Sequence, residues 1–107
     1  MPRRIAQKVF PREEKQLQDL GQRLRAARLR RRIPVGEMAA RVGIDRKTQW
    51  RLEQGDPSVS LAVLVRTLNV LGLSEDLDEL GAKDEIGRRL AEIELPERPH
   101  RKVKGSS

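Results

Sequence analysis

The 107-residue sequence contains no cysteine and no tyrosine, and its only aromatic residues are one phenylalanine and one tryptophan. Without cysteine the chain can form no disulfide, no thiolate nucleophile and no cysteine-ligated zinc finger. The single histidine, His100, stands near the C-terminus, so no histidine-based triad or metal cluster can be assembled. We therefore expect a protein that is not an enzyme and needs no cofactor or metal.

Long apolar runs are also missing. No stretch approaches the roughly 18 to 20 apolar residues that a membrane span requires, and the N-terminus has no continuous apolar signal segment. The lack of aromatic residues removes the platforms on which single-stranded bases stack. We expect a soluble, cytoplasmic protein without a membrane partner, and a length of 107 residues suits one small domain with tails.

The charge is positive and unevenly distributed. The formal net charge is +7, from 23 Lys and Arg against 16 Asp and Glu, which indicates a polyanionic partner. Basic residues crowd the segment up to Arg51 and the segment after Pro96. An acidic block separates them: Glu75, Asp76, Asp78, Glu79, Asp84 and Glu85. We infer that duplex DNA is the better polyanion and that it meets one side of the molecule.

Two short helices joined by a tight turn are predicted between Ile33 and Gly55. The first has apolar residues at helical spacing and stops at Gly43, which can adopt the left-handed conformation. Asp45 then has the side chain of an N-cap, and 46–54 continues without a breaker until Gly55. The pattern is that of a helix-turn-helix.

The two faces of the predicted 46–54 helix differ. Gln49, Leu52 and Glu53 fall on one side. The other side is cationic and rich in donors, with Lys47, Trp50, Arg51 and Gln54 at i, i+3, i+4 and i+7 and Arg46 at the N-terminal end. Arg and Lys in such positions can reach guanine O6 and N7 in the major groove. The alternative is a surface helix that is merely solvated.

The segments before this motif read as an arm and a helix. Residues 1–10 are basic and lack periodicity, so we interpret them as a flexible arm. A helix is predicted from Pro11 to near Arg31, with Leu17, Leu20, Leu24 and Ala27 along one stripe. Three arginines at its end are placed for phosphate contacts: Arg30, Arg31 and Arg32. Ser58, in the turn after the second helix, is a further candidate for phosphate, and a turn without a ligand is its alternative.

Two helices that complete the domain are predicted between Ser60 and Gly81. Ser60 caps the first of them, with a core stripe of Leu61, Leu64, Val65, Leu68 and Leu71. Val63 and Val70 lie outside that stripe, which indicates a dimer or partner surface. Ser74 caps the second helix, whose Leu77 and Leu80 face inward, and Gly81 closes it. The helix-turn-helix domain is thus expected to span 11–81.

The C-terminal part is predicted to be a helix and a tail. Within 82–95, Ile86, Leu90 and Ile93 repeat at i, i+4 and i+7, the width of a seam, and we interpret them as partner-facing. The alternative is a helix packed back on its own domain. Residues 96–107 carry prolines and basic residues, including the solvated His100, and are expected to be a disordered tail.

Residues 20–73 resemble the Xre/Cro family of lambda-repressor-like DNA-binding domains. The resemblance lies in the first-helix positions Leu20, Leu24 and Ala27, the A-x-x-x-G of Ala39 and Gly43, and the L-E-x-G of Leu52, Glu53 and Gly55. It implies an all-α fold of five to six helices and a structural ion pair between Arg28 and Glu53. It also implies that Arg46, Lys47 and Arg51 read base edges, with Thr48, Trp50 and Gln54 as secondary contacts to bases or backbone.

The sequence departs from the family pattern in three places. Pro34 and Val35 stand where Thr-Gln usually opens the second helix, so a phosphate contact made by that Gln has no counterpart. Gln49 replaces an inward Ile or Val, and either it is hydrogen-bonded in the core or Trp50 rotates to cover it. Arg32 replaces the glycine that usually ends the first helix, where it could bond the last free carbonyls.

The function expected from these observations is sequence-specific binding of double-stranded DNA by a homodimer on a palindromic operator. The R-I-P-V-x-E-M and Q-G-D-P-S-V-S-L segments further resemble HipB-like antitoxins, and that resemblance implies autorepression and a HipA-like kinase toxin as partner. Two alternatives stay open. One is a stand-alone Xre-family regulator, and the other is a protein-interaction module that has lost DNA binding.

Overall fold

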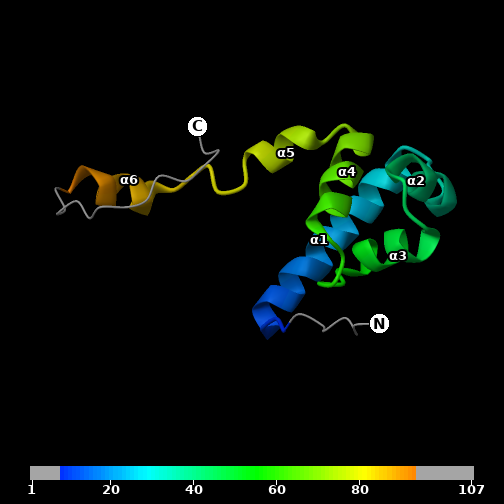
Figure 1. The fold of residues 1–107 in the computed structure, drawn as a ribbon, viewed down its shortest axis with the longest axis horizontal. Coiled ribbons are helices and arrows are strands. Elements are labelled where there is room, and N and C mark those ends of the chain that lie inside the picture. Colours follow the sequence, from blue (N-terminus) through cyan, green and yellow to red (C-terminus); the bar gives the residue numbers. More distant parts are fainter. Residues whose placement is uncertain (1–7, 94–107) are drawn as a thin grey trace, which may run out of the picture.

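The computed structural model describes residues 8–93, and within that range it contains helices and no strand (Figure 1). The elements are α1 (Pro11–Arg30), α2 (Val35–Val42), α3 (Arg46–Gln54), α4 (Leu61–Leu71), α5 (Ser74–Asp78) and α6 (Glu85–Glu92). The expected all-α class is confirmed. Most of the predicted arm, Leu95 and the predicted tail with His100 lie outside the described residues. None of the helices within 8–93 is long and apolar enough to cross a lipid bilayer.

The helix boundaries follow from local chemistry that the sequence displays. Pro11 occupies the first turn of α1, and the backbone N–H of Phe10 donates to the Glu13 carboxylate at 3.0 Å. The hydroxyl of Ser60 accepts from the backbone N–H of Val63, which caps α4 as expected. Helices α2, α3 and α4 each end at a glycine with positive φ, the first of them Gly43 at 90°.

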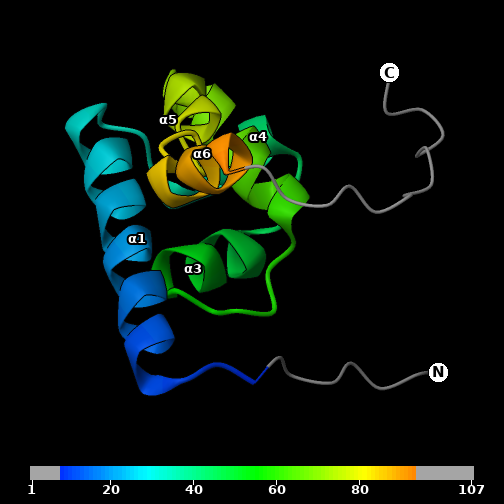
Figure 2. The ribbon, with the colours of Figure 1, turned by 90° about the vertical axis from the view of Figure 1, so that its left-hand side faces the viewer.

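Helices α1 to α4 enclose the hydrophobic core. Figure 2 shows α1 along one side, with α3 and α4 packed beside it. Apolar residues of all four helices are buried there: Leu24, Ala27, Met38, Ala39, Val42, Leu52, Leu68 and Leu71, together with Ile33 from the α1–α2 connection. The predicted α1 stripe therefore faces the core, fully at Leu24 and Ala27 and partly at Leu20.

Gly21 lets α1 approach the C-terminal end of α3 at backbone distance. A Cβ atom at Gly21 would overlap with the carbonyl oxygen of Glu53 and would lie 2.9 Å from the backbone nitrogen of Gly55. Gly55 faces the same crossing, because a Cβ there would lie 2.7 Å from the backbone of Leu17 and Gln18. The two glycines therefore set how deeply α3 sits against α1.

The α1 C-terminus is closed by backbone bonds, although no glycine stands there. Arg32 adopts a left-handed φ of 56°, its N–H donates to the Leu29 carbonyl, and the N–H of Ile33 donates to the Arg28 carbonyl. The expectation that the Arg32 side chain would bond the last carbonyls is not met. Its neighbour does so instead, because Arg31 Nη1 donates to the Ala27 carbonyl at 2.7 Å.

The predicted core stripe of α4 was partly wrong. Leu61 is 77% exposed, whereas Thr67 is fully buried. Val63 and Val70, expected outside the stripe, are half-buried and pack against the core. The buried face is therefore rotated about the helix axis toward Thr67, because α1, α2 and α5 all contact α4 and together cover more than one stripe.

Helix α5 also differs from its prediction. It begins at Ser74 itself, with Leu73 at the N-cap and no side-chain capping bond, so Ser74 is not the cap. Leu77 packs against the core, but Leu80 is 71% exposed. The reason is that α5 ends at Asp78, which places Leu80 in the following turn and not on the helical face of Leu77.

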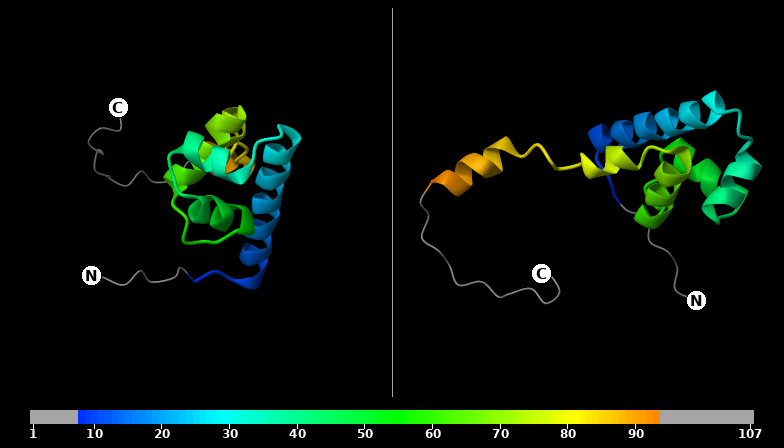
Figure 3. Two further views of the ribbon diagram at one scale, coloured as in Figure 1. Left: turned by 90° about the vertical axis from the view of Figure 1, so that its right-hand side faces the viewer. Right: turned by 90° about the horizontal axis from the view of Figure 1, so that it is seen from above.

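Helix α6 stands apart from the other helices. Figures 1 and 3 show it beyond the end of α5, on the side away from α2 and α3. The Asp84 side chain accepts from the Gly87 N–H and caps it. Ile86, Leu90 and Ile93 are 74%, 50% and 55% exposed. Within the described residues the alternative of a helix packed back on its own domain is therefore not what the structure adopts.

The Gly21 contact predicts a large cost for a single methyl group. Gly21→Ala should lower the free energy of unfolding by about 2 kcal/mol, because the added carbon meets rigid backbone. Gly36→Ala is the control, since Gly36 is also helical but faces the flexible Arg46 side chain. Urea denaturation measures both, and equal stability of the two variants would contradict the close approach.

Candidate nucleic-acid interface

Helix α3 begins at a capped and charged N-terminus. The Asp45 carboxylate accepts from the backbone N–H of Thr48 at 2.8 Å. Hydrogen bonds from the Thr48 side chain and backbone, helped by the charge of Arg51, hold the pKa of Asp45 below its ordinary value. Asp45 therefore stays ionised at neutral pH and anchors the first turn of α3.

The inner face of α3 is buried as the sequence predicted. Gln49, Leu52 and Glu53 are all buried. Gln49 Nε2 donates to Glu53 Oε2 at 2.9 Å, while Trp50 is 57% exposed. Of the two alternatives for Gln49, the structure thus adopts the hydrogen-bonded core residue, and Trp50 does not cover it.

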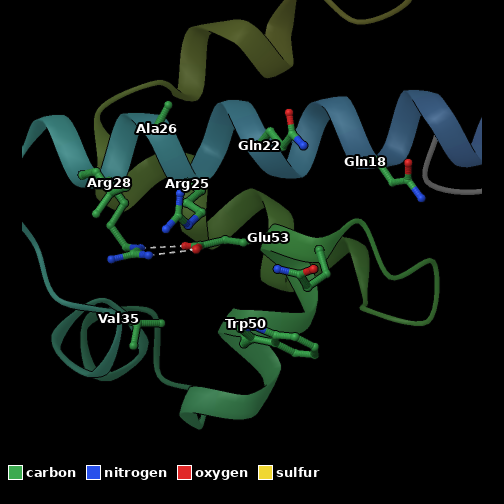
Figure 4. A pocket seen from close by; sticks show the side chains of 10 residues that line it. Gln18, Gln22, Arg25, Ala26, Arg28, Val35, Trp50 and Glu53 are labelled. Atoms are coloured by element: carbon green, nitrogen blue, oxygen red, sulfur yellow. Dashed lines mark hydrogen bonds and ion pairs between the residues drawn. The ribbon is translucent and has the colours of Figure 1, made fainter.

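The expected ion pair between α1 and α3 is present. Arg28 Nε donates to Glu53 Oε2 at 2.7 Å and Arg28 Nη2 donates to Glu53 Oε1 at 3.0 Å, so the pair is bidentate. Arg28 Nη1 donates to the Ile33 carbonyl at 2.8 Å. Both side chains are buried, and Figure 4 shows the pair bridging the two helices. This contact joins α1, the α1–α2 connection and α3.

The outer face of α3 carries the predicted donors. Arg46, Lys47, Trp50 and Gln54 are exposed, and Thr48 and Arg51 are half-buried. The Arg46 side chain lies beside Gly36 of α2, since a Cβ at Gly36 would lie 3.3 Å from Arg46 Nε. Among the described residues Arg46, Lys47 and Arg51 form no ion pair, although Arg51 is near enough to Asp45 for its charge to help lower the pKa of that carboxyl.

A groove of about 820 Å³ lies next to this face, lined by α1, the start of α2 and α3. Its walls include Gln18, Gln22, Arg25 and Leu29 of α1 and Trp50 and Gln54 of α3 (Figure 4). The sequence analysis did not single out Arg25. Its position three residues before Arg28 could have indicated it, because residues at i and i+3 lie on the same face of a helix.

The other predicted contact residues lie in different places. Arg30 lines a second groove between α1 and α5, and Arg31 is held by the Ala27 carbonyl. Arg32 is exposed at the α1–α2 connection. Ser58 donates to Asp56 Oδ1 from both its N–H and its hydroxyl, at 2.8 Å each, so a carboxylate stands beside this turn. Arg30 thus lines a different groove from the one beside the donors of α3.

Comparison with protein families identifies the motif. Residues 19–80, more than half of the chain, match the model of a helix-turn-helix domain. The chain belongs to the helix-turn-helix domain family. The all-α fold agrees with a lambda-repressor-like DNA-binding domain, and the match supports a DNA-binding regulator. No match was found among curated proteins.

The matched region of this helix-turn-helix protein covers the buried ion pair, the capped α3 and its cationic face. It stops at Leu80 and so leaves α6 outside the family model. The second helix, α2, opens with Pro34 at its N-cap and has no side-chain capping bond.

The ion pair should contribute strongly to stability. Arg28→Ala leaves Glu53 charged, buried and unpaired, and is expected to cost about 3 to 5 kcal/mol of unfolding free energy. Lys15→Ala, which breaks the exposed Lys15–Asp19 pair, should change stability by less than about 1 kcal/mol. Denaturant titration of both variants measures this. A cost for Arg28→Ala as small as that for Lys15→Ala would show that the pair does not hold α3.

Proposed function

We propose that this protein is a sequence-specific regulator that binds double-stranded DNA through the outer face of α3. One observation carries the proposal: α3 is fixed by a buried inner face, while its outer face presents Arg and Lys side chains that form no ion pair among the described residues. A helix with such a face fits the major groove, where arginine can bind guanine O6 and N7 bidentately.

In this proposal Arg46, Lys47 and Arg51 read base edges. Arg46 and Lys47 lie in the first turn of α3, the end of a recognition helix that enters the groove. Thr48, Trp50 and Gln54 supply secondary contacts to bases or backbone. Arg31, Arg32 and Ser58 are retained as phosphate contacts, whereas Arg30 is left out because it lines the groove between α1 and α5.

We further propose that two copies bind together. One recognition helix reads only a few base pairs, so a two-fold dimer on a palindromic operator, with half-sites about 34 to 36 Å apart, adds the affinity and specificity that one copy lacks. The exposed apolar side chains of α6, Ile86, Leu90 and Ile93, support the presence of a second surface besides the one for DNA.

The biological role that we propose is that of a HipB-like antitoxin of the Xre family, which represses its own operon and binds a HipA-like kinase toxin. The support is the resemblance of the entry to α2 and of the turn after α3, together with α6 outside the matched domain. A stand-alone Xre-family regulator is the alternative. Co-purification of a kinase-like protein with the tagged full chain, or a kinase-like gene beside its own, favours the antitoxin. A chain that purifies alone and represses without such a neighbour favours the alternative.

Substitution of the base-reading arginines tests the DNA proposal. Arg46→Ala and Arg51→Ala should each weaken binding to the selected operator by about 1 to 3 kcal/mol and relax base preference at particular positions. Arg88→Ala, an exposed arginine on α6, is the matched control and should leave base preference unchanged. Selection of bound duplexes followed by titration measures both effects. Equal weakening on every sequence would contradict the assignment of Arg46 and Arg51 as base readers.

A protein-interaction module that has lost DNA binding is the competing function. Pro34, Val35 and the buried Gln49 favour it, because each departs from the pattern of a DNA-binding relative. Phosphate neutralisation makes log K fall with log salt with a slope of about −0.9 per contact. A steep negative slope supports DNA binding, and no affinity for any duplex at low salt supports the interaction module.

A further inference from the structure

The groove beside the outer face of α3 carries hydrogen-bond donors that the described chain does not use. Gln18, Gln22 and Arg25 of α1 line it, and all three side chains are exposed. They stand at i, i+4 and i+7, so they share one face of α1 over about 10 Å of its length. Within residues 8–93 none of these side chains makes a hydrogen bond or an ion pair.

The charge of Arg25 is not offset by an acidic side chain in the groove. Of the described residues that line it, only Glu53 is acidic, and both of its carboxylate oxygens accept from Arg28. Glu14 and Asp19 stand near in the sequence of α1, but neither lines the groove. The α1 wall therefore presents donors and a positive charge, which is the chemistry that binds an anionic oxygen.

The opposite wall of the groove belongs to the proposed DNA-binding face. Trp50 and Gln54 lie on the outer face of α3 and also line the groove, and Figure 4 shows Trp50 across from Arg25 of α1. The Gln54 side chain likewise makes no hydrogen bond within the described residues. At the α2 end the groove is lined by Val35, which offers no side-chain donor. The donors therefore come from α1 and α3 together.

The dimensions of a helix and of the major groove indicate what lies opposite this surface. An α-helix with its side chains is about 10 to 12 Å across, and the major groove of B-DNA is about 12 Å wide. A recognition helix therefore fills the major groove, and the protein surface beside it meets the sugar–phosphate strand that borders that groove. The α1–α3 groove is such a surface, because it shares Trp50 and Gln54 with the outer face of α3.

We propose that the α1–α3 groove receives the sugar–phosphate backbone of one DNA strand, next to the bases that α3 reads. Arg25 pairs with a phosphate, Gln18 and Gln22 donate to neighbouring backbone oxygens, and the Trp50 ring packs against a deoxyribose. This contact reads no sequence, but it fixes the register of α3 in the major groove. The inference rests on the proposed DNA binding and adds α1 to its interface.

Replacement of Arg25 tests the backbone contact. Arg25→Ala should weaken binding by roughly tenfold at about 0.1 M salt, by the same factor on every duplex, and should make the slope of log K against log salt less negative by about 0.9. Arg23→Ala is the matched control, because Arg23 is also an exposed arginine of α1 but lines the groove on the α4–α5 side. It should keep the wild-type slope. Fluorescence anisotropy with the full chain measures both variants, and urea denaturation checks that both fold.

Neutral methylphosphonate linkages locate the phosphate. They are placed one at a time along each strand of an operator half-site, so each duplex lacks the charge of a single phosphate. At the phosphate that Arg25 binds, the replacement should weaken the wild type roughly tenfold and leave Arg25→Ala almost unaffected, because the two changes remove the same contact. Gln22→Ala keeps the positive charge and should remain sensitive at that position.

Four results would overturn the backbone contact. Wild-type affinity and slope for Arg25→Ala, alongside relaxed base preference for Arg46→Ala, would leave the proposed DNA binding intact and assign the groove to another partner. Relaxed preference at one base position in Arg25→Ala would make Arg25 a base reader. Equal changes in slope for Arg25→Ala and Arg23→Ala would show only the loss of overall charge. A wild-type chain that binds no duplex at low salt would remove the proposed function and this contact together.

Discussion

The buried pair between Arg28 and Glu53 is the contact on which the orientation of α3 depends. The pair is bidentate. Arg28 also donates to the Ile33 carbonyl and Glu53 also accepts from Gln49, so these bonds join α1, the α1–α2 connection and α3. A pair of this geometry fixes rotation of α3 about its axis more tightly than apolar packing alone, because the two parallel hydrogen bonds allow one relative orientation. The outward direction of Arg46, Lys47 and Arg51 is the consequence.

Much of this architecture could be predicted from local sequence signals. Gly43, Asp45 and Gly55 define the ends of α2 and α3 because capping depends on neighbouring residues alone. The burial of Leu24 and Ala27 follows from helical periodicity. The buried inner face and the exposed outer face of α3 were likewise predicted correctly, since α1 and α2 together cover one side of this nine-residue helix.

The errors arose where several elements meet. Thr67 is buried and Leu61 exposed because α4 contacts three other helices, and a single apolar stripe cannot represent that. The role of Gly21 depends on the backbone of α3, more than thirty residues away in sequence, and no local pattern reveals it. The location of Arg30 beside α5 depends in the same way on tertiary packing.

The two ends of the molecule carry opposite charge and different proposed tasks. We propose that the cationic face of α3 binds DNA and that the acidic α5–α6 end binds protein.

Dimethyl sulfate interference on the selected operator tests the central claim most directly. The reagent methylates guanine N7 in the major groove and adenine N3 in the minor groove. Our account predicts that N7 methylation within each half-site excludes that duplex from the bound fraction. Binding that tolerates N7 methylation throughout the operator would contradict it.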